Sequence, residues 1–156
     1  MVSRAGKKVD PQIELVKAHE SERALVSILL NYPEDVSLKF VETGFRTSDI
    51  YDNRLRIVAE TMLGQVGQAK STDIRVIFEL ARQKDQLEFF ELSELYTVCP
   101  IKSALTDHLE LVRTASKRRA LQILLHEMQA SVTSEELPTF ISSIIAQAES
   151  IRDEIA

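Results

Sequence analysis

The chain has 156 residues, a formal net charge of −5 and 44% apolar side chains, which is enough to bury one hydrophobic core. The acidic balance excludes a general electrostatic attraction to nucleic acid, and the short apolar runs exclude a membrane span of about 20 residues. The single cysteine, Cys99, allows no internal disulfide and no cysteine-based zinc site. We therefore expect a soluble, cytoplasmic domain without a secretory signal.

Helices are predicted in close succession along the first half of the chain. Residues 1–17 read as a flexible basic arm. Apolar residues at helical spacing begin after Ser21, and Pro33 ends this helix because a residue before proline disfavours the helical region. A short helix then covers residues 34–41, and Gly44 suits the left-handed position that closes it.

The second half continues the helical pattern. Asp52 is a predicted cap for a helix that ends before Gly64. Thr72 or Asp73 is the predicted cap of the next helix, with Val76, Ile77 and Leu80 facing inward. Further helices are expected at residues 89–98, 103–130 and 133–156. No segment alternates with a period of two, so the predicted fold is all-α: a compact helical head, a helical hairpin and a C-terminal linker helix. The predicted domains are the arm 1–17, a helical domain 18–132 and the linker helix 133–156.

Two apolar faces and one basic run are candidate contact sites. The long helix is expected to form a hairpin with residues 89–98, and the candidate self-association residues on it are Leu105, Leu109 and Val112. The last helix carries an apolar stripe with spacings of 3, 4, 3 and 4, namely Ile141, Ile144, Ala148, Ile151 and Ile155. Such a narrow stripe suits docking on one partner surface. The basic run is Lys117, Arg118 and Arg119, a possible local contact with nucleic acid or an acidic partner. The alternatives are an ordinary core for the apolar faces and a solvated helix face for the basic run.

No catalytic, cofactor or metal site is predicted. Gly64 to Ser71 almost spells the phosphate-binding loop G-x-x-x-x-G-K-[ST], but Ala69 stands where the second glycine is required, and a helix rather than a strand precedes it. His19, His108 and His126 lie on separate predicted helices and form no metal-binding pair.

Several segments, in their order, resemble the N-terminal domain of DnaB-type replicative DNA helicases. Ser21 to Leu30 is similar to the opening pattern A-E-x-x-[LV]-L-G-x-[LM]-[LI], with Ser27 in place of glycine. Glu91 to Pro100 is similar to Y-L-x-x-L-x-x-x-x-P, with Glu91 in place of tyrosine. The remaining similar segments are Asp49-Ile50-Tyr51, Arg54 to Val58, Thr72-Asp73, Leu111-Val112, Arg118 to Leu121 and, like the family's linker helix, Ile145 to Ile151. The resemblance covers residues 18–156.

The resemblance implies a domain without a motor. In this family the domain forms a collar above a RecA-like ATPase ring, pairs through a helical hairpin, and docks the primase or the helicase loader. The implied partners are further copies of the chain, from a dimer up to a hexameric collar, and a primase or loader in a bacterial or phage-infected cell. DNA would be met only through the intact protein, an ATP-dependent DNA helicase. We expect the chain to be a fragment of such a helicase rather than a free-standing copy of the collar.

Three other classes fit parts of the sequence. The helicase-binding domain of a primase shares a similar helical layout. A small all-α protein that binds nucleic acid or regulates the replisome would need a basic recognition helix, and none of the short helices is basic. A helical enzyme would need a catalytic constellation. The opening pattern from Ser21 and the linker-like ending favour the helicase domain.

Overall fold

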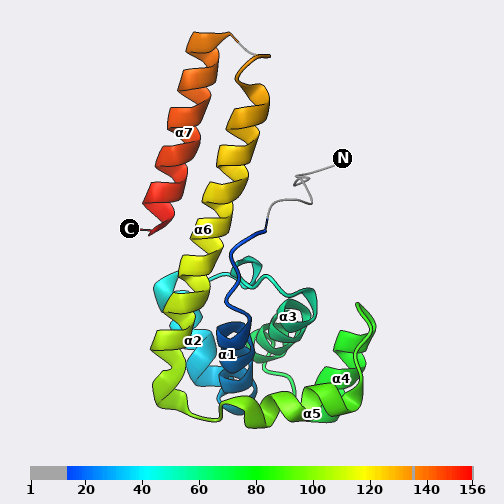
Figure 1. Ribbon diagram of the computed structural model, residues 1–156. Coiled ribbons are helices and arrows are strands. Elements are labelled where there is room, and N and C mark those ends of the chain that lie inside the picture. The colour runs from blue at the N-terminus through cyan, green and yellow to red at the C-terminus, as the bar shows by residue number, and fades with distance from the viewer. Residues whose placement is uncertain (1–13, 135, 156) are drawn as a thin grey trace. The chain divides into compact units, whose positions relative to one another are not determined.

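The computed structural model describes residues 14–134 and 136–155, and all regular structure in these residues is helical (Figure 1). The elements are α1 (His19–Asn31), α2 (Pro33–Thr43), η1 (Thr47–Asp49), α3 (Asn53–Gly67), α4 (Ile74–Arg82), α5 (Phe89–Val98), η2 (Lys102–Ala104), α6 (Leu105–Ser131) and α7 (Leu137–Ile155). The all-α prediction is confirmed. Most of the predicted arm, residues 1–13, lies outside the described residues, as does Glu135 before the last helix.

The chain divides into two compact units. One unit is residues 18–113, called the head below. The other contains residues 1–17 and 114–156, and its described part is called the hairpin unit. The second boundary falls inside α6, which continues through it as one helix, whereas the predicted domain ended at residue 132. The reason is that Val112 is the last residue of α6 to belong to the apolar core of the head.

Helix α1 is the centre of the head. It packs against α2, α3 and α5, and every residue from Ala24 to Leu30 is buried. A helix that is buried on all sides needs apolar residues around its whole circumference, which this segment supplies. The core therefore closes within the head, around Leu25, Ile28 and Leu29.

One buried charge organises the turn before α3. Glu22 is only 1% exposed, and its carboxylate accepts hydrogen bonds from the backbone N–H groups of Tyr51 (2.6 Å) and Asp52 (3.1 Å). Asp52 in turn accepts a hydrogen bond from the N–H of Leu55 (3.0 Å) and caps α3 as predicted. Glu22 thus links α1 to the first turn of α3 by charge-assisted hydrogen bonds.

Two polar side chains of α1 hold the end of α5. The buried hydroxyl of Ser27 accepts a hydrogen bond from the N–H of Cys99 (2.9 Å). The side-chain amide of Asn31 donates to the carbonyl oxygens of Ser27 (2.9 Å) and Tyr96 (2.8 Å). Partial burial raises the pKa of the Tyr96 phenol. The turn after α5 is therefore positioned by α1 and not by its own sequence alone.

The end of α3 differs from the prediction. The helix continues through Gly64, before which we predicted its end, and it stops at Gly67. Ala69 then takes a left-handed conformation with φ 55°, and the N–H of Lys70 bonds to the carbonyl of Gln65 (2.8 Å). The near-match to a phosphate-binding loop is thus a helix end, as the sequence indicated, because no strand precedes it.

Helix α4 begins directly after Asp73, one of the two predicted caps. Asp73 accepts a hydrogen bond from the N–H of Arg75 (2.9 Å), and this bond lowers the pKa of its carboxyl group. Ile77 and Ala81 form its buried face, one turn apart. Val76, predicted to face inward, is exposed because the helix buries a narrower face than expected.

Candidate functional site

The hairpin unit is built from the second half of α6 and from α7, which returns alongside it (Figure 1). Leu124 of α6 and Phe140 of α7 are the most deeply buried apolar residues of this pair. Ile144 and Ile151 follow Phe140 along the same side of α7 and are half-buried. The hairpin therefore has a single thin seam of apolar contacts, since only two helices meet.

Polar side chains gather on one flank of this seam. Glu127 and Ser131 of α6 line a hollow there together with Ser143 and Gln147 of α7. A second hollow on the same flank adds Ser150. This side of the hairpin, called the polar flank, is suited to water.

The opposite flank is apolar. Successive residues of a helix are rotated by about 100° around its axis. The residue that directly follows each seam residue, such as Leu125 after Leu124, therefore lies on this second flank. These positions hold Leu121 and Leu125 on α6, Val132 directly after α6, and Leu137, Ile141 and Ile145 on α7. All six side chains are exposed. We call these six residues the apolar flank.

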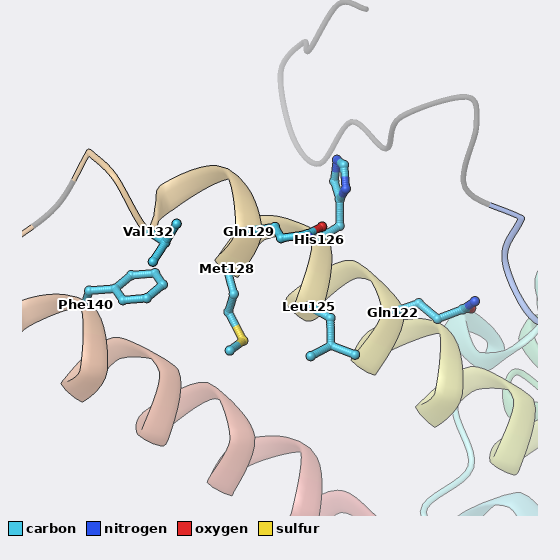
Figure 2. Close-up of a pocket in the computed structure, with 7 residues that line it drawn as sticks. All are labelled: Gln122, Leu125, His126, Met128, Gln129, Val132 and Phe140. Carbon is cyan, nitrogen blue, oxygen red and sulfur yellow. The ribbon is translucent and has the colours of Figure 1, made fainter. Parts of the chain in front are cut away.

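Part of the apolar flank is hollowed (Figure 2). Leu125 and Met128 of α6, Val132 just after this helix and Phe140 of α7 line this hollow, together with Gln122, His126 and Gln129. Val132 lies next to Phe140, Leu125 is 57% exposed and Ile141 is 52% exposed. A row of exposed aliphatic side chains on two adjacent helices is unusual for a surface that faces only water, so this flank is a candidate contact site.

The predicted self-association residues lie elsewhere. Leu105, Leu109 and Val112 are 7%, 2% and 0% exposed and belong to the core of the head. They fill the chain's own core, and their role in self-association stays a prediction. Helix α5 packs against α1 and α4, and its Leu92 and Leu95 share the apolar core of the head with Leu105 and Leu109 of α6. The helix that runs alongside the second half of α6 is α7 (Figure 1).

The predicted stripe of the last helix is divided between two sides of α7. Ile144 and Ile151 turn to the seam with α6, while Ile141 and Ala148 are exposed. The side chain of Ile155 lies outside the described residues. Docking of this helix on a partner thus stays a prediction, carried by Ile141 and its exposed neighbours and not by the whole stripe.

The basic run is split as well. Arg118 is exposed and Lys117 half-buried, but Arg119 is buried and donates a hydrogen bond to the carbonyl of Val16 (3.0 Å). Arg119 is engaged with the chain itself. The local contact that we predicted for this run would therefore rest on Lys117 and Arg118.

A further groove lies in the head, between the starts of α1 and α3 and one side of α5. Leu55 and Leu95 form part of its apolar lining, and Phe90 at its edge is 63% exposed. Glu91 bridges its rim, with one carboxylate oxygen 2.9 Å from the guanidinium of Arg54 and the other bonded to the N–H of Glu88 (2.8 Å). Glu91, which replaces a tyrosine of the family pattern, thus holds α5 in place.

The comparisons with known proteins agree with this architecture. The family model described as "DnaB-like helicase N terminal domain" matches residues 14–114, which include the whole head. The crystal structure of the N-terminal domain of DnaB helicase from Mycobacterium tuberculosis is similar with a TM-score of 0.78 and 15% identity, over 88% of this chain and 99% of that one. No curated protein matches. None of the helices in the described part of the chain is both long and apolar enough to span a membrane.

Proposed function

We propose that this chain, which belongs to the DnaB-like helicase N-terminal domain family, is a non-catalytic assembly domain that pairs with further copies of itself through the apolar flank. In this family the domain is the part of a replicative DNA helicase that lacks the motor. ATP hydrolysis is accordingly not expected from the chain alone.

The observation that carries the proposal is the one-sided character of the hairpin. Six exposed aliphatic residues lie on one flank of the hairpin, in a surface that also includes Gln122, His126 and Gln129. The opposite flank holds serine, glutamine and glutamate beside Ala120, Ile123 and Ile151. Two such hairpins can place their apolar flanks face to face and form a four-helix bundle, in which each seam gains the second layer that a lone hairpin lacks. We infer that the partner is a second copy of the chain. In a dimer with a two-fold axis, the apolar flank of one copy faces the apolar flank of the other.

The test is the oligomeric state of the full chain. We expect light scattering after size-exclusion chromatography to show a dimer or a larger assembly at tens of micromolar. Ile141→Asp places an unpaired charge in the apolar flank and should weaken self-association at least about tenfold. Ser150→Asp adds the same charge on the polar flank of the same helix and is the matched control. A wild-type chain that stays monomeric at high micromolar concentration in low salt contradicts the proposal.

Docking of a primase or a helicase loader is a second part of the proposal and is supported by the family membership. The groove beside Phe90 is the surface of the head that we assign to it, because it joins an apolar floor to a charged rim. Titration of the chain with the helicase-binding domain of a primase, followed by calorimetry, tests this part. Phe90→Ala should weaken the complex, whereas Val41→Ala, an equally exposed apolar site on α2, should not.

A further inference from the structure

The buried Arg119 and the nearby Gln122, both on α6, form hydrogen bonds with backbone groups of residues 14–16. The amide of Gln122 accepts a hydrogen bond from the N–H of Val16 (2.8 Å) and donates one to the carbonyl of Glu14 (3.0 Å). Arg119 donates to the carbonyl of Val16 (3.0 Å). Three backbone groups of one short segment are thus held by two side chains one helical turn apart.

The bonding pattern requires an extended segment. A single side-chain amide can bond to the carbonyl of residue 14 and the N–H of residue 16 only when both groups point to the same side, as they do in a β-strand. The carbonyl of Val16 then points to that side too, where Arg119 meets it. Gln122 and Arg119 therefore contact residues 14–16 as a neighbouring strand would.

Recognition at this site depends little on the identity of the bound residues. The three bonds use only backbone groups, and the side chains of Glu14 and Lys17 are exposed. Leu15 and Val16 are half-buried and add apolar contact. Any extended segment with small or medium apolar side chains at these two positions offers the same groups.

The site lies away from the seam and next to the apolar flank. Arg119 and Gln122 project from the side of α6 that is turned away from the seam with α7, because they are about 140° and 160° around the helix from Leu124. Gln122 also lines the hollow of the apolar flank together with Leu125 (Figure 2).

We propose that Arg119 and Gln122 form a binding site for an extended peptide main chain, and that residues 14–16 occupy it as a replaceable strap. The covalent connection gives the strap a high effective concentration, in the millimolar range for a short flexible link, so it excludes weak competitors. An extended peptide gains access when the strap is released. The site is thus autoinhibited by the chain that carries it.

The experiment uses the full chain and a synthetic peptide with the sequence of residues 12–18, acetylated, amidated and fluorescently labelled. The strap is weakened by the double change Leu15→Asp and Val16→Pro, which removes an apolar contact and the N–H that Gln122 accepts. Fluorescence polarisation should show saturable binding to this variant and none to the wild-type chain. A peptide methylated on the nitrogen of Val16 should bind at least about tenfold more weakly.

Further variants locate the site. In the strap-weakened chain, Gln122→Ala or Arg119→Ala should lower peptide affinity at least about tenfold, while Arg118→Ala removes an exposed charge next to the site and should leave affinity unchanged. Equal binding by wild-type and strap-weakened chains, or binding that ignores Gln122→Ala, overturns the proposal.

Hydrogen exchange provides a reading that does not depend on the strap variant. In the wild-type chain the Val16 amide should be protected, and Gln122→Ala should abolish this protection while Arg118→Ala keeps it. An unprotected Val16 amide in the wild-type chain also overturns the proposal.

Discussion

The head buries its aliphatic residues, whereas the hairpin unit leaves several aliphatic residues exposed. In the head, α1 is covered on all sides and its aliphatic side chains from Leu25 to Leu30 are buried. In the hairpin unit, Leu124 and Phe140 are buried and the neighbouring Leu125 and Ile141 are exposed. The head therefore completes its own core, whereas two helices alone can cover only one side of each other. The comparison places the closed apolar core in the head and the exposed aliphatic surface in the hairpin unit.

The largest expected difference between the two regions comes from removing an aliphatic side chain. Leu29→Ala in α1 should lower the free energy of unfolding of the head by about 2–5 kcal/mol, because a fully buried leucine leaves a cavity. Leu125→Ala in the hairpin should change it by less than about 0.5 kcal/mol. Urea unfolding followed by circular dichroism measures both. Equal losses would mean that the hairpin shares the core of the head.

A smaller loss is expected from the buried charge of the head. Glu22→Ala removes the acceptor for the N–H groups of Tyr51 and Asp52 and should cost about 2–3 kcal/mol. Glu20→Ala, on the exposed side of the same helix, is the matched control and should cost little. If both variants unfold at the same urea concentration, Glu22 has no role in holding α1 to the start of α3.

Backbone conformation should produce effects of roughly 1 kcal/mol with opposite signs. Ala69 and Gly44 both take left-handed conformations, with φ 55° and 72°. Ala69→Gly should stabilise the head by up to about 1 kcal/mol, and Gly44→Ala should destabilise it by a similar amount. Thermal melting of the two variants checks the pair, and a shift of both in the same direction would contradict the assignment.

The smallest expected effect on the head comes from the end of α7. Ile151→Asp places a charge beside Ala120 and Ile123 of α6, within the hairpin unit. It should loosen the hairpin and weaken assembly but leave the melting of residues 18–113 almost unchanged. Melting followed together with light scattering separates the two readouts. A loss of several kcal/mol in the head would contradict a docking role for this helix.

Local patterns in the sequence predicted most helices of the head. They did not predict the hydrogen bonds between residues that are far apart in the chain. The apolar spacing from Ala24 to Leu29, and the caps at Asp52 and Asp73, depend on neighbours within a turn or two, so the helices were predictable. The burial of Glu22 and Arg119 depends on backbone groups far away in the chain, which local spacing in the sequence does not indicate.

The candidate surface was predicted only in outline. The predicted self-association residues Leu105, Leu109 and Val112 are buried in the head, whereas the exposed apolar residues of the hairpin unit lie after the boundary within α6. Leu105 and Leu125 have the same helical spacing to their apolar neighbours, and spacing alone does not tell whether other helices cover them. The adjacent pair Leu124-Leu125 is the feature of the sequence that indicates an exposed apolar surface. A helix with a single partner helix buries only one of two adjacent leucines, so the other is left exposed.

The hydroxyl of Ser27 ties the choice of residue in α1 to the path of a distant turn. The family pattern has glycine at this position, and here the serine is fully buried and accepts the N–H of Cys99. Glycine at this position would leave that N–H without this acceptor. In this chain the serine and the path of the turn after α5 therefore depend on each other, and a relative with glycine here should satisfy this turn in another way.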